Sequence, residues 1–208
     1  MKTIILDHPL IKHKLGILRD KNTSTKEFRE LASELSMFLC YEATKDIETF
    51  KVEVETPLTK TIVERIDENK FAFLPILRAG ISMVDGIIKV IPNAKIGHIG
   101  LYRNEETLEP IRYYYKVPKD INNRQVFILD PMLATGGSVC DAIKLIKEDG
   151  VKNIKVLSII SAPEGLEKIE QCHPDVQVYT AIVDSHLNDV GYIVPGLGDA
   201  GDRIFGTN

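Results

Sequence analysis

The hydrophobic pattern of the chain changes repeatedly between short apolar runs and longer segments with helical spacing. Five runs of four to eight mostly apolar residues are typical of strands buried on both faces of a sheet. They span 71–76, 96–102, 126–129, 153–160 and 176–182. Other segments place apolar residues three or four positions apart, as helices do, at 28–39, 81–91, 139–146 and, more weakly, 164–172. This alternation predicts an α/β fold with an open, mainly parallel sheet flanked by helices.

The helix expected at 28–39 has a clear start signal. Ser24 and Glu27 resemble a capping box, in which a hydroxyl and a carboxylate satisfy free backbone N–H groups. The apolar stripe from Phe28 to Leu39 then predicts a core or subunit-interface helix rather than a ligand site.

Composition and charge narrow the class of protein. With 208 residues and 44% hydrophobic content, the chain can bury one sizeable core, which predicts a single domain spanning 1–208. The formal net charge of −4 gives no electrostatic reason to expect nucleic-acid binding. No apolar run approaches the roughly 20 residues of a membrane span, and the charged start at 1–7 is too short for a signal peptide.

Cysteine and histidine usage adds two expectations. The cysteines are odd in number and lack metal-ligand spacing, so no disulfide framework is implied for Cys40, Cys140 and Cys172. We therefore expect a reducing, cytoplasmic location without membrane attachment. The five histidines are scattered, and no general base stands out among His8, His13, His98, His173 and His186.

The segment 126–138 joins a buried strand, a carboxylate and a glycine loop. Asp130 follows the strand, and Thr135 to Ser138 lead into a helical pattern. Free backbone N–H groups and two hydroxyls therefore converge at a helix N-terminus, where an anion of phosphate size fits. The alternative is an ordinary strand-to-helix turn, in which the glycines only tighten the chain and Asp130 is a solvated acid.

Two more loops follow strands and belong to the same edge of a parallel sheet. At 75–80, Arg78 precedes two small residues, and its guanidinium can bind a diphosphate bidentately; the alternative is an arginine that caps a helix turn. The polar segment 101–110 suits an arm that closes over substrate. Its acids Glu105, Glu106 and Glu109 are expected to form a solvated face. The tyrosines at 113–115 could stack on a base. Alternation of exposed and buried positions along a half-exposed arm explains them better, and we expect a subunit contact there.

The stretch 191–203 is too rich in glycine for an ordinary strand or helix. Such a loop can present its own backbone donors and acceptors to a flat ligand. A surface Ω-loop is the alternative.

These segments together resemble one enzyme family. The sequence Asp-Pro-Met-Leu-Ala-Thr-Gly-Gly-Ser at 130–138 resembles the 5-phosphoribosyl-1-diphosphate (PRPP) motif of type I phosphoribosyltransferases, in the form of the uracil phosphoribosyltransferases. Most type I members carry two adjacent acids there, whereas Asp130 is followed by Pro131. This departure argues against the purine and orotate branches and leaves one ribose hydroxyl without an obvious side-chain partner. The resemblance extends to 12–16, 41–44, 75–80 and 191–203, and so covers essentially the whole chain.

The resemblance implies transfer of phosphoribose from PRPP to uracil, giving uridine monophosphate (UMP) and diphosphate in pyrimidine salvage. The catalytic residues that it implies are Arg78, Arg103, Asp130 and Asp199. The implied PRPP contacts are Arg78, Ala79, Gly80, Arg103, Asp130, Pro131, Met132, Leu133, Ala134, Thr135, Gly136, Gly137, Ser138 and Asp199. The implied uracil contacts are Tyr192, Ile193, Gly198, Asp199 and Ala200.

Further features follow from the same resemblance. It implies a flexible arm at 102–117 and a uracil-binding hood at 184–208. In the family the loop at 75–80 often carries a non-proline cis peptide, and its presence at Arg78–Ala79 stays open. It implies Mg²⁺ held mainly by PRPP and water, near Asp199, since no metal site is evident from side chains alone. It also implies a homo-oligomer and leaves a GTP effector open.

Two alternatives remain at this point. One is a PRPP-sensing regulator of the same fold, which should show a basic face or an added binding domain. The other is a phosphoribosyltransferase for another base.

Overall fold

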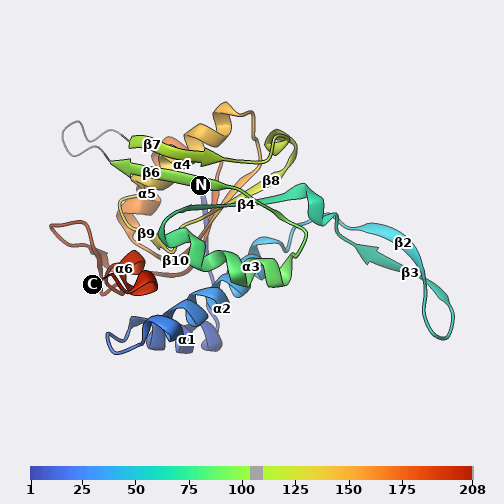
Figure 1. Cartoon of the computed structure of the whole chain (residues 1–208), viewed down its shortest axis with the longest axis horizontal. Coiled ribbons are helices and arrows are strands. Elements are labelled where there is room, and N and C mark those ends of the chain that lie inside the picture. Colours follow the sequence, from blue (N-terminus) through green and yellow to red (C-terminus); the bar gives the residue numbers. More distant parts are fainter. Residues whose placement is uncertain (104–109, 208) are drawn as a thin grey trace.

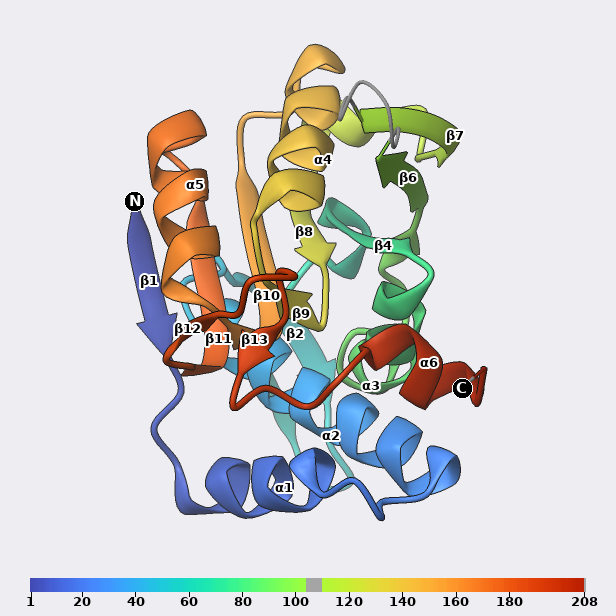
Figure 2. The same ribbon diagram turned by 90° about the vertical axis from the view of Figure 1, so that its left-hand side faces the viewer.

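Seven strands form the main path of one sheet, in the order β1-β11-β10-β8-β4-β6-β7 (Figures 1 and 2). In that order they span Lys2–Ile5, Gln177–Val183, Ile154–Ser161, Gln125–Leu129, Phe71–Leu77, His98–Arg103 and Pro110–Lys116. All neighbours are parallel except β6 and β7. Two short strands, β5 (Lys95–Ile96) and β9 (Met132–Leu133), pair with β4 and β10. The predicted open, mainly parallel sheet is confirmed.

The computed structural model describes residues 1–103 and 110–207, with the backbone alone at Arg103 and Pro110. The acids Glu105, Glu106 and Glu109 of the expected arm lie outside the described residues. No helix in the described ranges is long and apolar enough to cross a membrane.

Helices cover both faces of the sheet (Figure 2). One layer holds α1 (Pro9–Arg19), α2 (Thr25–Ala43) and α3 (Val84–Val90), and the other holds α4 (Gly137–Glu148) and α5 (Pro163–Cys172). A final short helix, α6 (Ala200–Phe205), packs beside α2. The described residues also contain three short 3-10 helices: η1 (Glu68–Lys70), η2 (Ala79–Met83) and η3 (Ile121–Asn123).

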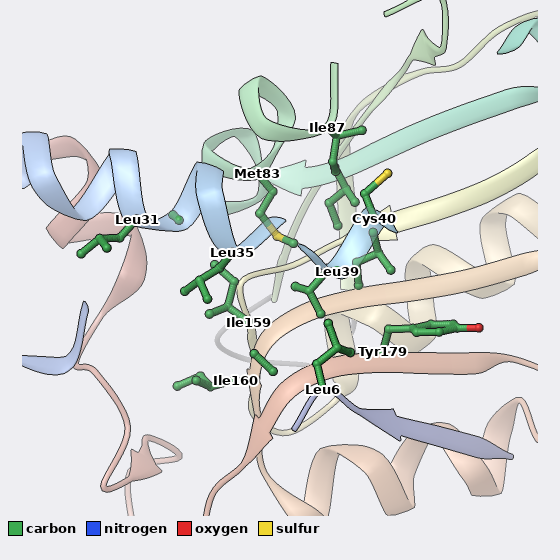
Figure 3. Packing of buried hydrophobic residues seen from close by; sticks show 14 of the residues in the cluster. Leu6, Leu31, Leu35, Leu39, Cys40, Met83, Ile87, Ile159, Ile160 and Tyr179 are labelled. Carbon is green, nitrogen blue, oxygen red and sulfur yellow. The ribbon is translucent and has the colours of Figure 1, made fainter. Parts of the chain in front are cut away.

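Alternate residues of the central strands face the two helical layers, because successive side chains of a strand point to opposite faces. Phe73 of β4 and Phe127 of β8 stack on the α2 side, with ring centroids 4.7 Å apart. Leu74 and Ile128, one residue further along each strand, belong to the core on the other side. Figure 3 shows the first core, in which Leu39 lies with the strand residues and Met83. The fully apolar strand runs are thus explained by burial on both faces.

The predicted elements differ from the observed ones in three places. The helix expected at 81–91 begins as η2 and becomes α-helical only at Val84. The strand expected at 96–102 breaks at Gly97, whose N–H donates to the Phe73 carbonyl at 3.0 Å. The glycine-rich segment contains β13 (Ile193–Val194) and α6, so the expectation of neither strand nor helix there was wrong.

A two-stranded hairpin extends far from the rest of the molecule (Figure 1). It consists of β2 (Phe50–Glu55) and β3 (Lys60–Arg65), which pair with each other in antiparallel register. The apolar pattern did not predict it.

Candidate active site

Three adjacent strands bring the predicted residues to one edge of the sheet. Asp130 follows β8, Arg78 follows β4, and Arg103 is the last residue of β6. Because β8, β4 and β6 are parallel neighbours, their carboxyl ends meet at the same edge (Figure 2). The side chain of Arg103 lies outside the described part of the structure.

The loop after Asp130 is fixed by β9 and by buried hydrogen bonds. The Leu133 N–H donates to Ser158 Oγ at 3.1 Å, and the Leu133 carbonyl accepts from the Ala162 N–H at 2.8 Å. Gly136, with φ of +77°, then begins α4 and has no side chain that could cap it; the Gly137 N–H donates to Thr135 Oγ1 at 3.4 Å. Residues 130 and 132–139 line a small cavity of about 100 Å³. Backbone N–H groups at an uncapped helix start favour an anion in this cavity.

Helix α5 supports this loop through glycine. A Cβ atom on Gly165 would lie 2.4 Å from the Ala134 carbonyl oxygen, and one on Gly136 would lie 2.8 Å from the Gly165 oxygen. The two backbones therefore touch, and neither position has room for a side chain. Sequence reasoning missed Gly165; a glycine in the first turn of an expected helix was the available signal.

Asp130 is half-buried between the strand end and the loop. Burial raises the pKa of its carboxyl to about 7, and the hydrogen bond from the Met132 N–H, at 3.3 Å, opposes this shift only in part. The adjoining Pro131 carbonyl accepts from the Ile159 and Ile160 N–H groups at 3.1 and 3.0 Å. The backbone beside the carboxyl is therefore held in place.

Arg78 is exposed and faces the C-terminal segment. Its side chain makes no capping hydrogen bond to η2, so the alternative of an arginine cap is not observed. The peptide bond between Leu77 and Arg78 is cis, one residue before the Arg78–Ala79 bond at which a cis peptide was left open. The guanidinium carbon lies 5.5 Å from the centroid of the Phe205 ring, and a Cβ on Gly201 would lie 3.9 Å from Arg78 Nη2.

Gly80 fits the Arg78 loop against the end of β8. A Cβ there would lie 2.5 Å from the carbonyl oxygen of Leu129, the residue before Asp130. The close approach of these backbones sets the spacing between Arg78 and Asp130.

The glycine-rich segment folds back over this edge. Within the hood, 184–208, the strands β12 (His186–Leu187) and β13 are antiparallel, and the Val194–Pro195 peptide bond is cis. A Cβ on Gly191 would lie 3.9 Å from Thr135 Cγ2, which places the tip of the segment against the loop after Asp130. The Leu187 N–H also donates to Glu164 Oε1 at 2.9 Å, at the start of α5.

The residues expected to read the base differ in their exposure to solvent. Ile193 and Ala200 are buried, whereas Tyr192, Gly198 and Asp199 are exposed. Asp199 has a role that the sequence did not predict, because Oδ1 accepts the Asp202 N–H at 2.9 Å and caps α6.

The arm residues divide between solvent and the α4 layer. Tyr113 and Tyr114 are both exposed, while the Tyr115 hydroxyl donates to Asp149 Oδ2 at 2.5 Å. Burial, with the bond to Asp149, raises the pKa of Tyr115. The expected simple alternation along 113–115 was therefore wrong.

Two histidines have structural roles. His8 Nδ1 accepts the Leu10 N–H at 3.1 Å and caps α1, and His173 Nε2 lies 3.0 Å from the Cys140 carbonyl oxygen. These contacts give both side chains a structural role.

No group of three or more His, Cys, Asp or Glu side chains that could hold a metal lies within the ranges 1–103 and 110–207. The exposed Asp199 fits a magnesium ion only if a diphosphate and water supply most of the oxygen ligands. This donor set is consistent with an ion that arrives with its substrate.

Comparisons with known proteins agree with this geometry. Residues 5–207 match the family model described as uracil phosphoribosyltransferase. The uracil phosphoribosyltransferase of Streptococcus mutans is 57% identical over 203 residues, covering 98% of this chain and 97% of that protein. The protein of that name from Lachnoclostridium phytofermentans is 58% identical over 203 residues, with the same coverage.

Solved structures give the same picture. The AQ2163 protein from Aquifex aeolicus superposes with a TM-score of 0.92 at 44% identity, over 98% of this chain and 97% of that one. An adenine phosphoribosyltransferase from Trypanosoma brucei gives a TM-score of 0.59 at 15% identity, covering 95% of this chain and 87% of its own, which shows a shared fold alone.

Proposed function

The chain belongs to the uracil phosphoribosyltransferase family, and from this premise we propose that it joins N1 of uracil to C1 of PRPP, giving UMP and diphosphate in pyrimidine salvage. It is a pentosyltransferase. One observation carries the proposal: a strand-end carboxylate, an uncapped helix start, an exposed arginine and a glycine-rich fold-back meet at one sheet edge.

We assign the fixed parts of PRPP to the loop after β8. The 5-phosphate binds the N–H groups and hydroxyls of 135–138, and Asp130 accepts a hydrogen bond from a ribose hydroxyl. Both contacts lie away from the bond that breaks, so their binding energy holds the ribose in the reacting geometry.

The two arginines answer the charge of the leaving group. As the C1–oxygen bond breaks, positive charge grows on the ribose and negative charge on the diphosphate. Arg78, and Arg103 from the neighbouring strand, contact the diphosphate and stabilise that negative charge. A magnesium ion carried by PRPP, near Asp199, would neutralise further diphosphate charge. Water accepts the N1 proton of uracil directly, or backbone N–H groups of the hood stabilise the uracil anion and so favour release of this proton to solvent.

The base is read by main-chain groups of Ile193 and Gly198 to Ala200, with Tyr192 beside it. No lysine or arginine occurs in 191–200, so the carboxylate of orotate would be buried without a cationic partner. Cytosine reverses one donor and one acceptor of uracil. Two mismatches at about 1 to 3 kcal/mol each reduce kcat/KM by about a hundred- to ten-thousandfold.

A base panel tests the proposal. We expect turnover with PRPP, magnesium and uracil, acceptance of 5-fluorouracil, and rejection of cytosine, orotate and hypoxanthine, measured as steady-state kcat/KM. If any rejected base matched uracil, the assignment of the base site would be wrong. Assays with and without GTP test activation, which stays a prediction.

We also propose a homo-oligomer and a cytoplasmic location. The β2–β3 hairpin supports the first, because an isolated two-stranded hairpin is marginally stable and this one carries exposed Leu58 and Ile62. The three cysteines, Cys40, Cys140 and Cys172, are all free, which supports the second.

A further inference from the structure

An ion pair ties the first helix to the strand end that precedes the hood, the segment 184–208. Arg19 is the last residue of α1, and Asp184 follows β11 directly. Their contact is bidentate, with Nη1 2.8 Å from Oδ2 and Nη2 2.6 Å from Oδ1. The Asp184 side chain is only 3% exposed and that of Arg19 is 21% exposed. Such charge-assisted pairs are strong and geometrically specific.

Both members of the pair also bind the backbone of Gly196. The Gly196 N–H donates to Asp184 Oδ2 at 3.0 Å, and Arg19 Nη1 donates to the Gly196 carbonyl at 2.6 Å. Gly196 has φ of +59°, and a Cβ there would lie 2.1 Å from the Ile193 carbonyl oxygen. The pair therefore holds both polar groups of the tightest residue in this turn.

We propose that Arg19 and Asp184 are positioning residues for uracil. Gly196 lies between Ile193 and Gly198, the two places where main-chain groups read the base under the proposed function, on which this inference rests. A site made of backbone groups keeps its geometry only if other side chains hold that backbone. Arg19 and Asp184 hold this backbone from outside the base site. Two hydrogen bonds join the two side chains to each other, and two more join them to Gly196.

A purely structural ion pair on the same helix provides a matched control. Lys14 of α1 binds Glu34 of α2 at 2.6 Å, and its side chain is 22% exposed, close to the 21% of Arg19. The Lys14–Glu34 pair involves the same helix and a cation of similar exposure, although Glu34 is 46% exposed where Asp184 is 3% exposed. Its contact joins α1 to α2 and not to the hood. Lys14→Met therefore measures what the loss of an α1 ion pair does by itself.

The informative variants separate stability from positioning. Arg19→Lys keeps the positive charge but loses the planar, bidentate fork. The double variant Arg19→Met/Asp184→Leu removes both charges, so no buried charge is left without a partner, and such replacements often preserve stability. It nevertheless deletes both contacts to Gly196.

We expect the KM for uracil to rise about ten- to a hundredfold in both variants, the loss typical of charged hydrogen bonds. The KM for PRPP should stay within about twofold of wild type, because Ser158 and the backbone of Gly165 in α5 hold the loop that leads to 135–138. Hydrogen–deuterium exchange should quicken in peptides that cover 191–198. Lys14→Met should change neither KM nor this exchange.

The outcomes distinguish this inference from the proposed function. If the wild-type chain does not turn over uracil and PRPP, the proposed function is wrong, and exchange at 191–198 still tests the anchor. If wild type turns over but the double variant shows an unchanged KM for uracil and unchanged exchange, the positioning role is overturned. Equal rises in both KM values, or a fall in Tm alone like that of Lys14→Met, would also overturn it.

Discussion

The Asp130 carboxylate is proposed to bind substrate, and its burial lowers the stability of the folded protein. Burial raises the pKa of its carboxyl to about 7, because the half-buried position disfavours the charged form. A ribose hydroxyl that donates to this carboxylate would add a hydrogen bond that stabilises its charged form. The same side chain should therefore be favourable for substrate binding and unfavourable for folding at neutral pH.

The first prediction concerns activity. Asp130→Asn should lower kcat/KM for PRPP about ten- to a hundredfold, because a charge-assisted hydrogen bond contributes roughly 1.5 to 3 kcal/mol. The exposed Asp189 offers a control at the tip of the hood, since Asp189→Asn makes the same charge change and should leave kcat/KM within about twofold. A near-normal kcat/KM in Asp130→Asn would contradict the assignment.

The second prediction concerns stability of the ligand-free protein. The carboxyl pKa is about 7 in the folded state, against an ordinary value of 3.8 in the unfolded chain, so the folded state binds more protons between these pH values. The favourable contribution of the Asp130 carboxyl to the free energy of unfolding is fully present below about pH 4 and is lost as the pH rises through 7. Asp130→Asn should therefore be more stable than wild type at pH 8, by about 2 to 4 kcal/mol, with a smaller difference at pH 5. Urea midpoints at both pH values and one protein concentration measure this; a variant less stable at pH 8 would refute it.

At the scale of elements, the packing of α2 on α3 depends on a missing side chain. A Cβ on Gly86 of α3 would lie 1.9 Å from the Ser33 carbonyl oxygen of α2. Backbone atoms cannot rotate away, so the two helices would have to separate. The short distance between these helices places Met83 and Ile87 in the core beside Leu39 (Figure 3).

The third prediction uses two glycines in helices. Gly86→Ala should destabilise the fold by about 1 to 3 kcal/mol or more through overpacking. Gly16→Ala in α1 should stabilise it by about 0.5 to 1 kcal/mol, because a Cβ there meets nothing within 4 Å and alanine favours helix. Denaturant midpoints give both values, and changes of the same sign would contradict the packing argument.

Long periodic elements were predictable from the sequence, because burial on both faces leaves an apolar run of the right length. The runs at 71–76 and 126–129 became β4 and β8, and Ser24 caps α2 as its spacing indicated, with Oγ accepting the Glu27 N–H at 3.2 Å. Elements of two to six residues, such as β9 and α6, are too short for a periodic signal.

Residues of the candidate site were also predictable only where a local sequence pattern marks them. Asp130 was predicted because it follows a recognisable strand, and Arg78 because its loop resembles that of the family. The structure brings both residues to one sheet edge, and their roles stay predictions. Arg19 was missed, since its partner Asp184 is 165 positions away and no local pattern joins them. Asp199 was expected at the site, but its side chain also caps a helix whose start the glycine-rich composition concealed.

At the scale of the whole molecule, topology assembles the site. Parallel neighbours β8, β4 and β6 end at one edge, and the hood returns from β11 to the same edge. The β2–β3 hairpin leaves in another direction and does not extend over that edge (Figure 1). Its function must therefore be sought outside the site.

The last prediction assigns the hairpin to contact with a second copy of the chain. Leu58 is 95% exposed, Ile62 is 66% exposed and Phe50 is 49% exposed on an extension that packs only weakly on the rest of the described chain. Burying side chains of this size contributes about 1.5 to 3 kcal/mol each, which would stabilise both the hairpin and an oligomer. Wild type should therefore sediment as a dimer or larger species.

Ile62→Glu should shift that equilibrium toward monomer, because a charge would be buried in an apolar contact. Val190→Glu is the control, since Val190 is 76% exposed but lies in the hood rather than on the hairpin. Sedimentation velocity over a range of concentrations separates the cases. A monomeric wild type, or an Ile62→Glu variant of unchanged size, would show that the hairpin does not join two copies.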